Sequence, residues 1–275
     1  MLPPPHIPPS PQSHKMNPAA RIPMEPHLSS SPTLLSTPDF HARVHSLSPQ
    51  IAVFDCDGTL WSGDAGSAFM HWTIDTKLIS PEQISWILER YEGYKNKTVS
   101  EYDICGDMTT VYAGLPVETL RSAAAQFFAE YIEPNIFPEL AVLITELQHN
   151  SCDIWAVSST NNWVIEEGVR RFSIPANHVL AAHVEIDANG LITDKLIHVP
   201  TDEDKVEALR RVGITSGEHA PDAVFGNSIH DAAMLSIART QNNIQGAFPI
   251  NPSTDLLTRA ATEGWPVYFP ASVTP

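Results

Sequence analysis

Short, mainly apolar runs alternate with stretches of helical periodicity along most of this chain. The apolar runs predict buried strands at 51–55, 153–157, 223–226 and 246–250, with a further candidate at 266–269. Apolar residues that recur every three or four positions predict helices at 138–149, 161–172, 202–211, 230–238 and 253–262. Strands that alternate with helices are typical of a parallel sheet covered by helices, so we predict the α/β class.

The interval between the first two predicted strands is about 95 residues long, whereas a crossover helix requires only a dozen or so. Apolar residues recur at helical spacing through residues 63–132. We therefore predict a small helical domain inserted after the first strand, where it can cover a bound ligand and exclude water. Further along, alternating residues around Asn189-Gly190 predict a β-hairpin over 182–198.

The N-terminal segment differs from the rest in composition. Residues 1–40 contain 11 of the 24 prolines, which remove backbone donors and favour extended conformations. We predict a disordered, proline-rich tail over 1–48, an α/β core over 49–62 and 133–275, and a helical cap over 63–132. A docking segment for a protein partner and a passive leader are both consistent with the tail.

The composition limits the classes of partner that the protein can bind and indicates its cellular compartment. The net charge of −16 argues against nucleic acid or an anionic membrane surface as the main partner, because both bind basic footprints. No apolar stretch approaches the roughly 18 residues that span a bilayer, and no signal-peptide core is evident. The three cysteines, Cys56, Cys105 and Cys152, are odd in number and lack metal-ligand spacing. This usage indicates a reducing compartment, so we expect a cytoplasmic protein.

The most informative motif is Asp55-Cys56-Asp57-Gly58-Thr59, directly behind the apolar run 51–54. A buried parallel strand delivers such a motif to the carboxyl edge of the sheet, where α/β proteins bind ligands. Two carboxylates placed two residues apart at this edge can serve as a nucleophile and a proton carrier beside a divalent cation.

Three later elements could complete such a site, and each also has an ordinary structural interpretation. Ser158 and Ser159 follow the strand 153–157, where a hydroxyl can bind a phosphate oxygen or cap the next helix. Lys205 can neutralise an anion or lie on the surface of its acidic helix. Asn227 and Asp231 follow the strand 223–226, where their oxygens can bind a hard cation or form an Asx-turn and a helix-terminal acid.

These four elements, in this order, resemble the haloacid dehalogenase superfamily, specifically its phosphoserine-phosphatase-like branch. The branch pattern is D-x-D-G-T, a Ser or Thr after a strand, a Lys, and G-D-x-x-x-D. The resemblance covers roughly residues 50–270 and implies a Rossmann-like core with an inserted helical cap. One position departs from the pattern: Asn227 stands where the family usually has Asp, which would weaken Mg²⁺ binding without removing an oxygen ligand.

The resemblance also implies a role for each matching residue. Asp55 would be the nucleophile that becomes an aspartyl-phosphate, and Asp57 would be the general acid and base. The phosphate-binding residues would be Gly58, Thr59, Ser158, Ser159 and Lys205. The Mg²⁺ ligands would be Asp55, the backbone carbonyl of Asp57, Asn227 and Asp231, the last either directly or through water.

The same resemblance suggests a substrate and leaves other functions open. In the serine-phosphate members an acid after the first motif meets the substrate ammonium, and an arginine in the cap meets its carboxylate. Asp64 and Arg90 are the candidates here, although Asp64 could instead cap the following helix. We expect a Mg²⁺-dependent phosphatase acting on a small phosphomonoester, either phosphoserine-like or another amine-bearing metabolite phosphate. Phosphotransfer to an alcohol and non-catalytic binding of a phospho-ligand are the alternatives.

Overall fold

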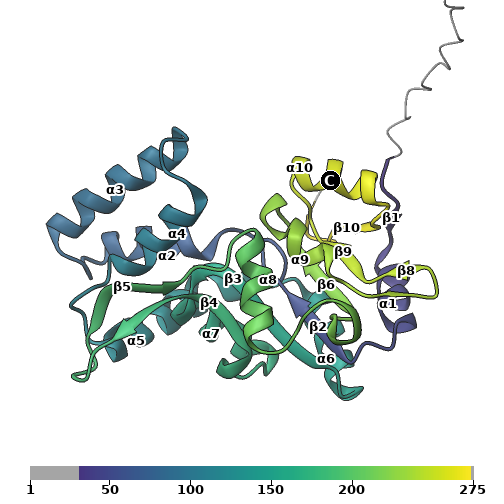
Figure 1. Ribbon diagram of the computed structural model, residues 1–275. Coiled ribbons are helices and arrows are strands. Elements are labelled where there is room, and N and C mark those ends of the chain that lie inside the picture. The colour runs from purple at the N-terminus through teal and green to yellow at the C-terminus, as the bar shows by residue number, and fades with distance from the viewer. Residues whose placement is uncertain (1–30, 274–275) are drawn as a thin grey trace, which may run out of the picture.

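The computed structural model describes residues 31–273 and contains a six-stranded sheet between two layers of helices (Figure 1). All neighbouring strands are parallel except the first pair. In spatial order the strands are β5 (Ile192–His198), β4 (Val179–Ile186), β3 (Asp153–Asn161), β2 (Ile51–Phe54), β6 (Ala223–Gly226) and β9 (Ala247–Pro249). The predicted α/β class is confirmed.

The central strand β2 is apolar throughout because both of its faces are covered. Val53 packs into one cluster of buried residues, whereas Ala52 and Phe54 pack into the other. Phe54 also stacks on Phe225 of β6, with ring centroids 4.2 Å apart. A strand that is buried on both faces reads as a continuous apolar run, which explains why β2 was predictable.

The core helices follow the predicted periodicity closely. They are α6 (Pro138–His149), α7 (Asn162–Val169), α8 (Glu203–Arg211), α9 (Ala232–Ser236) and α10 (Thr254–Glu263). Helix α9 is shorter than predicted, because Ile229–Asp231 form a 3-10 turn in which the Asp231 carboxylate accepts backbone hydrogen bonds from the preceding residues.

Two short strand pairs lie outside the main sheet. The strand predicted at 266–269 forms as β10 (Val267–Tyr268), but it pairs with β1 (Leu34–Leu35). The strands β7 (Thr240–Gln241) and β8 (Ile244–Gln245) form a small hairpin. The hairpin predicted at 182–198 is confirmed as the antiparallel pair of β4 and β5.

Four helices lie within residues 63–132, where an inserted helical domain is predicted. They are α2 (Ala65–Asp75), α3 (Pro81–Lys95), α4 (Glu101–Thr110) and α5 (Val117–Phe127), followed by a π-helical turn at Phe128–Ile132. Helix α4 packs against β3, β4 and β5. The backbone N–H of Val117 donates to the Gly190 carbonyl at the tip of the hairpin (2.9 Å). The inserted helices and the hairpin therefore lie side by side at one end of the molecule (Figure 1).

The prediction of a disordered tail over 1–48 is wrong for its last part, and residues 1–30 lie outside the described residues. Helix α1 (Thr37–Ser46) begins after the N-cap Ser36 and carries a proline in its first turn, where proline is tolerated. Phe40 and Val44, one turn apart on α1, are fully buried. Phe40 stacks on Tyr268 with ring centroids 4.3 Å apart. This aromatic packing orders a segment whose prolines and serines had predicted disorder.

Within residues 31–273, no helix combines the length and the hydrophobicity needed to cross a bilayer. Cys56, Cys105 and Cys152 are buried and carry free thiols.

Candidate active site

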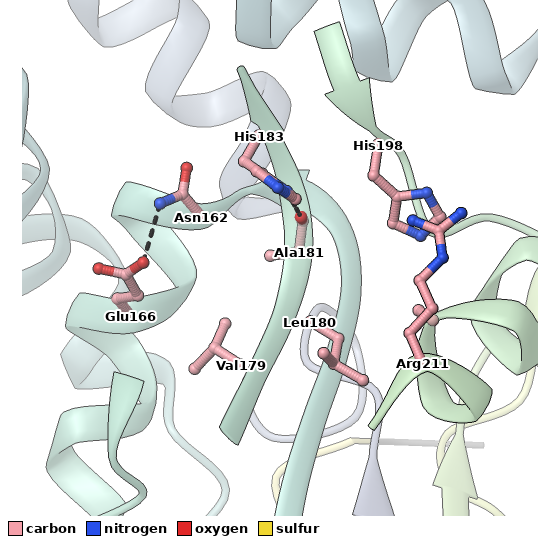
Figure 2. Close-up of a pocket in the computed structure, with 9 residues that line it drawn as sticks. Asn162, Glu166, Val179, Leu180, Ala181, His183, His198 and Arg211 are labelled. Atoms are coloured by element: carbon pink, nitrogen blue, oxygen red, sulfur yellow. Dashed lines mark hydrogen bonds between the residues drawn. The ribbon is translucent and has the colours of Figure 1, made fainter. Parts of the chain in front are cut away.

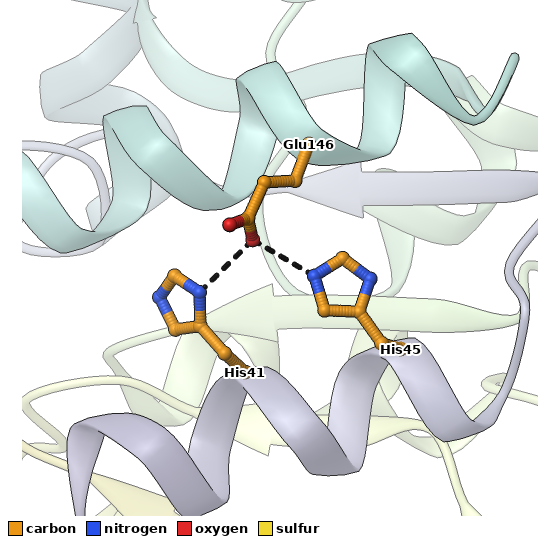
Figure 3. A group of neighbouring side chains, drawn as sticks. All are labelled: His41, His45 and Glu146. Carbon is orange, nitrogen blue, oxygen red and sulfur yellow. Dashed lines mark hydrogen bonds and ion pairs between the residues drawn. The ribbon is translucent and has the colours of Figure 1, made fainter.

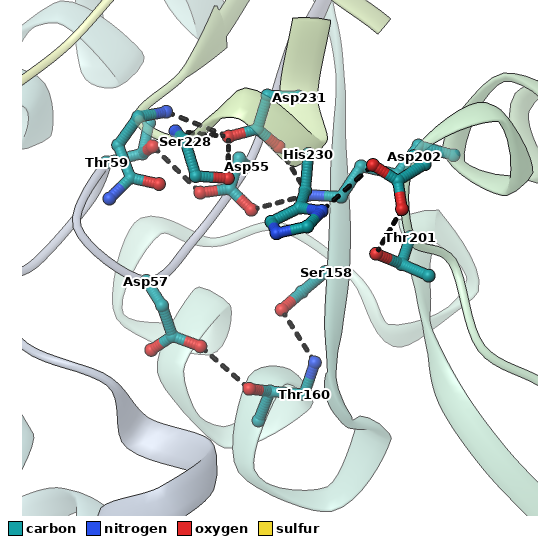
Figure 4. Close-up of polar contacts among 12 residues, drawn as sticks. Asp55, Asp57, Thr59, Ser158, Thr160, Thr201, Asp202, Ser228, His230 and Asp231 are labelled. Atoms are coloured by element: carbon teal, nitrogen blue, oxygen red, sulfur yellow. Dashed lines mark hydrogen bonds and ion pairs between the residues drawn. The ribbon is translucent and has the colours of Figure 1, made fainter. Parts of the chain in front are cut away.

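Asp55 stands at the carboxyl end of β2 and is nearly buried. Its Oδ1 accepts a hydrogen bond from Lys205 Nζ (2.8 Å), and its Oδ2 accepts one from Thr59 Oγ1 (2.8 Å) (Figure 4). Burial, followed by repulsion from Asp231, raises the pKa of Asp55 to about 6, although Lys205 and Thr59 favour its charged form. Asp55 is thus a partly desolvated carboxylate held by two donors.

Lys205 is buried on the inner face of α8, beside Ala208 and Leu209. Its Nζ also donates to Asp231 Oδ1 at 2.5 Å. Burial acts to lower the pKa of Lys205, but the carboxylates of Asp231 and Asp55 outweigh it, so the pKa lies above its usual value. The surface-lysine interpretation is therefore wrong: one ammonium compensates two buried carboxylates.

Asp57 is held from three sides. Its Oδ1 accepts hydrogen bonds from Trp61 Nε1 (2.7 Å) and the backbone N–H of Ala65 (2.8 Å), and its Oδ2 accepts one from Thr160 Oγ1 (2.8 Å). Burial and then the nearby charge of Asp64 raise its pKa to about 7. A carboxyl whose pKa is near neutral is suited to proton transfer in both directions.

Asp231 is fully buried, and both of its oxygens are occupied by protein donors. In addition to the Lys205 contact, Oδ2 accepts hydrogen bonds from the backbone N–H groups of Asn227 and Ser228, each at 2.9 Å. Of the two predicted ways for Asp231 to serve the metal, directly or through water, direct contact is disfavoured, because both of its oxygens bind protein donors and it does not line the pocket that contains Asp55. It instead orients Lys205 and the turn after β6, which presents Asn227 to that pocket.

Ser158 is buried at the carboxyl end of β3, where its Oγ accepts from the backbone N–H of Thr160 (3.2 Å). The N-cap of α7 is Asn161, whose side chain accepts from the N–H of Val164 (3.2 Å). The capping interpretation of Ser158 is therefore wrong. Ser158 and Ser159 both line the pocket.

These residues line a pocket of about 490 Å³ between the sheet edge and the inserted helices. From the sheet side, the pocket contains Asp55, Asp57, Gly58, Ser158, Ser159, Lys205 and Asn227. From the inserted helices it contains Tyr91, Tyr94, Glu101, Ile104, Cys105 and Met108. The sequence analysis did not single out Tyr91, Tyr94 or Glu101. The hydrophobic periodicity of the inserted helices shows which face of each helix is apolar, but it does not show which residues face the pocket.

The two predicted substrate contacts have different outcomes. Asp64 both lines the pocket and caps α2, accepting hydrogen bonds from the backbone N–H (3.0 Å) and Oγ (2.8 Å) of Ser67. Arg90 does not line the pocket, and its Nε donates to Asp107 Oδ2 at 2.6 Å. The prediction of Arg90 as a carboxylate-binding residue is not supported, because its guanidinium is engaged elsewhere. His230, which lies between Asn227 and Asp231 in the sequence, lines the pocket and contacts Asp202.

The donors at this edge suit a hard divalent cation. A carboxylate (Asp55), a backbone carbonyl (Asp57) and a side-chain amide (Asn227) supply oxygen ligands of the kind that Mg²⁺ prefers. The Asn227 amide lies against Gly58, since a Cβ added to Gly58 would come within 1.9 Å of its Nδ2. Asn227 is thereby held next to the Asp55–Gly58 turn.

The arrangement matches a known family. The model of the haloacid dehalogenase-like hydrolases matches residues 52–236 of this chain. The chain belongs to this family. The predicted resemblance and the prediction of a hydrolase are thus confirmed.

Two relatives of this haloacid dehalogenase-like hydrolase are phosphatases by name. It is 25% identical over 223 residues to a histidinol-phosphatase of Neisseria meningitidis serogroup C (strain 8013), covering 79% of this chain and 97% of that protein. It is 27% identical over 165 residues to a probable phosphatase of Mycobacterium tuberculosis (strain ATCC 25618 / H37Rv), covering 58% of this chain and 53% of that protein.

Solved structures share its fold. A protein from Bordetella pertussis Tohama I superposes with a TM-score of 0.66 at 20% identity, covering 79% of this chain and 97% of that one. A substrate-bound phosphoserine phosphatase superposes with a TM-score of 0.53 at 12% identity, covering 80% and 92%. At these identities the likeness concerns the fold alone.

The hydrolase also contains a pocket of about 230 Å³ against β4 and the helices α7 and α8 (Figure 2). None of its lining residues is among the predicted site residues. It contains His198, whose Nε2 is buried without a hydrogen-bond partner, and burial followed by the charge of Arg211 lowers the pKa of His198. This pocket lies apart from the pocket that contains Asp55 and Asp57, and the two pockets share no lining residue.

Proposed function

We propose that this chain is a Mg²⁺-dependent phosphatase that hydrolyses a small, amine-bearing phosphomonoester through an aspartyl-phosphate on Asp55. The observation that carries the proposal is the position of Lys205, which joins the nucleophile candidate Asp55 to Asp231 within the wall of a polar pocket. The histidinol-phosphatase relative supports the reaction type.

In this mechanism a carboxylate oxygen of Asp55 attacks the substrate phosphorus, and the bond to the leaving alcohol breaks. Asp57, in its protonated form, transfers its proton to the departing oxygen. Asp57 then accepts a proton from a water molecule that attacks the aspartyl-phosphate, which releases inorganic phosphate and regenerates Asp55. The raised pKa of Asp57 supports both proton transfers.

Positive charge is needed because an anionic nucleophile and an anionic phosphate repel each other. Lys205 and the Ser158 hydroxyl would hold the transferring oxygens, together with backbone groups of the Gly58–Thr59 turn. Bound Mg²⁺ would supply further positive charge at this edge, held by Asp55, the backbone carbonyl of Asp57 and Asn227.

We further propose that residues 63–132 act as a cap over a core of 49–62 and 133–275. Tyr91, Tyr94 and Glu101 of the inserted helices line the same pocket as Asp55. Their position supports a role in covering the substrate and excluding water during the reaction.

Free thiols at all three cysteines support a cytoplasmic location.

The acidic and aromatic side chains that line the pocket favour a cationic substrate group. Asp64 and Glu101 contribute acidic side chains there, and Tyr91 and Tyr94 contribute aromatic faces. No arginine lies among the described residues that line this pocket, and its single lysine is Lys205. A carboxylate, as in phosphoserine, would lack a cation partner. We therefore favour an amino-alcohol phosphate such as histidinol phosphate.

The proposal is tested by comparing kcat/KM for histidinol phosphate, phosphoserine and p-nitrophenyl phosphate with Mg²⁺ present. We expect histidinol phosphate to be the best substrate. Glu101→Gln should raise KM for it by about 10-fold or more, as for loss of a charge-assisted contact, and leave p-nitrophenyl phosphate unchanged. Glu92→Gln, on the exposed part of α3, is the matched control. Equal effects of both variants, or preference for phosphoserine, would refute the assignment of the amine.

The two alternatives predict different products. Phosphotransfer would give a phosphorylated acceptor when an alcohol is added, whereas hydrolysis gives only inorganic phosphate. Non-catalytic binding would give thermal stabilisation by phosphate esters without turnover. The environment of Asp57 favours catalysis over non-catalytic binding, because binding alone needs no carboxyl with a raised pKa.

A further inference from the structure

His41, His45 and Glu146 meet at the interface between α1 and α6 (Figure 3). Glu146 Oε2 lies 3.1 Å from His41 Nδ1 and 2.8 Å from His45 Nε2. The three ligand atoms lie within 4.8 Å of one another. Both imidazoles thus converge on one carboxylate oxygen instead of taking one oxygen each.

The sequence and the packing of α1 produce this convergence. His41 and His45 are four residues apart, so their side chains lie on one face of the helix, one turn apart. The adjacent face carries Phe40 and Val44, which are fully buried in the core. These two anchors fix the rotation of α1 so that both imidazoles point at α6, as Figure 3 shows.

The cluster is separate from the proposed catalytic site. Helix α1 leads into the start of β2, and α6 leads into the start of β3, so the cluster lies toward the amino ends of these strands. Asp55 and Ser158 lie at their carboxyl ends. A ligand bound between α1 and α6 therefore does not share the pocket of Asp55.

We propose that His41, His45 and Glu146 bind a divalent transition-metal ion of the Zn²⁺ type. Tetrahedral Zn²⁺ with ligands at about 2.0–2.1 Å requires ligand atoms roughly 3.3 Å apart. The two nitrogen–oxygen separations of 3.1 and 2.8 Å reach that spacing with small side-chain rotations. Two imidazoles and one carboxylate select Zn²⁺, Co²⁺ or Ni²⁺ over Mg²⁺ and Ca²⁺, which prefer all-oxygen sites.

The surroundings leave room for the ion and for a fourth ligand. His45 also lines a cavity of about 460 Å³ together with Ser48, Pro49, Gln50 and Asn150. The side chains of His45 and Glu146 are 32% and 43% exposed, so an ion and a water ligand can enter without opening the core. Because the site joins α1 to α6, a bound ion would hold the N-terminal helix against the core.

The test uses the full-length chain, freed of metal by chelation and kept in saturating Mg²⁺, which has little affinity for imidazole. Co²⁺ is added and its visible absorption is recorded, followed by competition with Zn²⁺. We expect one equivalent of Co²⁺ with the intense spectrum of four- or five-coordinate cobalt, displaced by Zn²⁺. An all-oxygen, six-coordinate site absorbs only weakly.

The variants His45→Gln and Glu146→Gln should each weaken Co²⁺ binding by at least about tenfold, since even the outer partners of a metal site contribute 10- to 100-fold. His149→Gln, which removes an exposed histidine of α6, the helix of Glu146, is the matched control and should bind Co²⁺ as the wild type does. His6, His14 and His27 are present in every variant, so any metal they bind cancels in the comparison.

Thermal unfolding gives a second measurement. Zn²⁺ should raise the midpoint of the wild type and of His149→Gln but not that of His45→Gln, because an ion that binds only the folded state stabilises it. The proposal is overturned if the wild type gives no such cobalt spectrum, or if His45→Gln and Glu146→Gln bind with wild-type affinity. Neither outcome depends on phosphatase activity, so failure here leaves the proposed function untouched.

Discussion

Lys205 and Asp231 form a buried ion pair with Nζ and Oδ1 2.5 Å apart. The same ammonium reaches Asp55 at 2.8 Å, while the second oxygen of Asp231 accepts two backbone hydrogen bonds from the turn after β6. One lysine therefore connects the ends of β2 and β6 from a third element, α8. The ion pair is both a scaffold for the site and a source of positive charge within it.

Replacing Lys205 should cost stability as well as activity. Lys205→Met leaves the carboxylates of Asp55 and Asp231 buried without a cation, so we expect the free energy of unfolding to fall by about 3–5 kcal/mol. Urea denaturation with a chelator present measures this. Lys205→Met combined with Asp231→Asn should cost less than the sum of the two single variants, because the partner charge is removed too. Additive losses would contradict a coupled pair.

Gly58 is required for a reason beyond its backbone conformation. Its φ of +74° is costly for other residues, and an added Cβ would meet the Asn227 amide at 1.9 Å. Gly58→Ala should lower stability and abolish most activity by displacing that amide. Gly213→Ala is the matched control, since Gly213 has a φ of +88° with nothing within 4 Å of an added Cβ. If both variants lose equal activity in a phosphatase assay, backbone strain alone explains the effect.

Asn227 should set the Mg²⁺ requirement. Asn227→Asp adds a negative charge beside the Asp55–Gly58 turn, so the Mg²⁺ concentration for half-maximal activity should fall by roughly tenfold. Asn251→Asp adds the same charge to another residue of the pocket lining and serves as the control. A comparable fall in both variants would mean that net charge, rather than ligation at position 227, governs the affinity.

His198 should make stability depend on pH. Burial lowers its pKa in the folded state, whereas the unfolded chain has a pKa of about 6.5. Above that pH His198 is neutral in both states; below it the unfolded state binds the proton first, so stability is lost as the pH falls. His198→Gln should therefore lose less stability than the wild type between about pH 8 and pH 5. His149→Gln, exposed on α6, should follow the wild type; identical curves for all three proteins would exclude the effect.

The sequence was sufficient to predict the site residues that directly follow a buried strand. Asp55, Ser158 and Asn227 each follow an apolar run, and parallel strands bring their carboxyl ends to one edge. Lys205 was harder, because its helix is acidic and polar. Its signal was present in the spacing: Lys205 shares a helical face with the apolar Ala208 and Leu209, three and four positions later.

Features that depend on how separate elements pack were not predictable from local pattern. Arg90 and Glu101 are both charged residues of inserted helices, and only the packing of α4 on β3 to β5 places Glu101 in the pocket while Arg90 pairs with Asp107. Helix α1 was missed because prolines and serines surround it. Its order comes from burial of Phe40 against Tyr268, which lies far along the chain.

The most direct test of the account is to locate the phosphoryl group on the protein. Asp57→Asn should form the intermediate from p-nitrophenyl phosphate, whose leaving group needs little proton donation, but should hydrolyse it slowly. Acid quenching followed by peptide mass spectrometry should then find a phosphoryl group on Asp55, and none when Asp55→Asn is added. A phosphoryl group on another residue, or wild-type turnover by Asp55→Asn, would contradict the account.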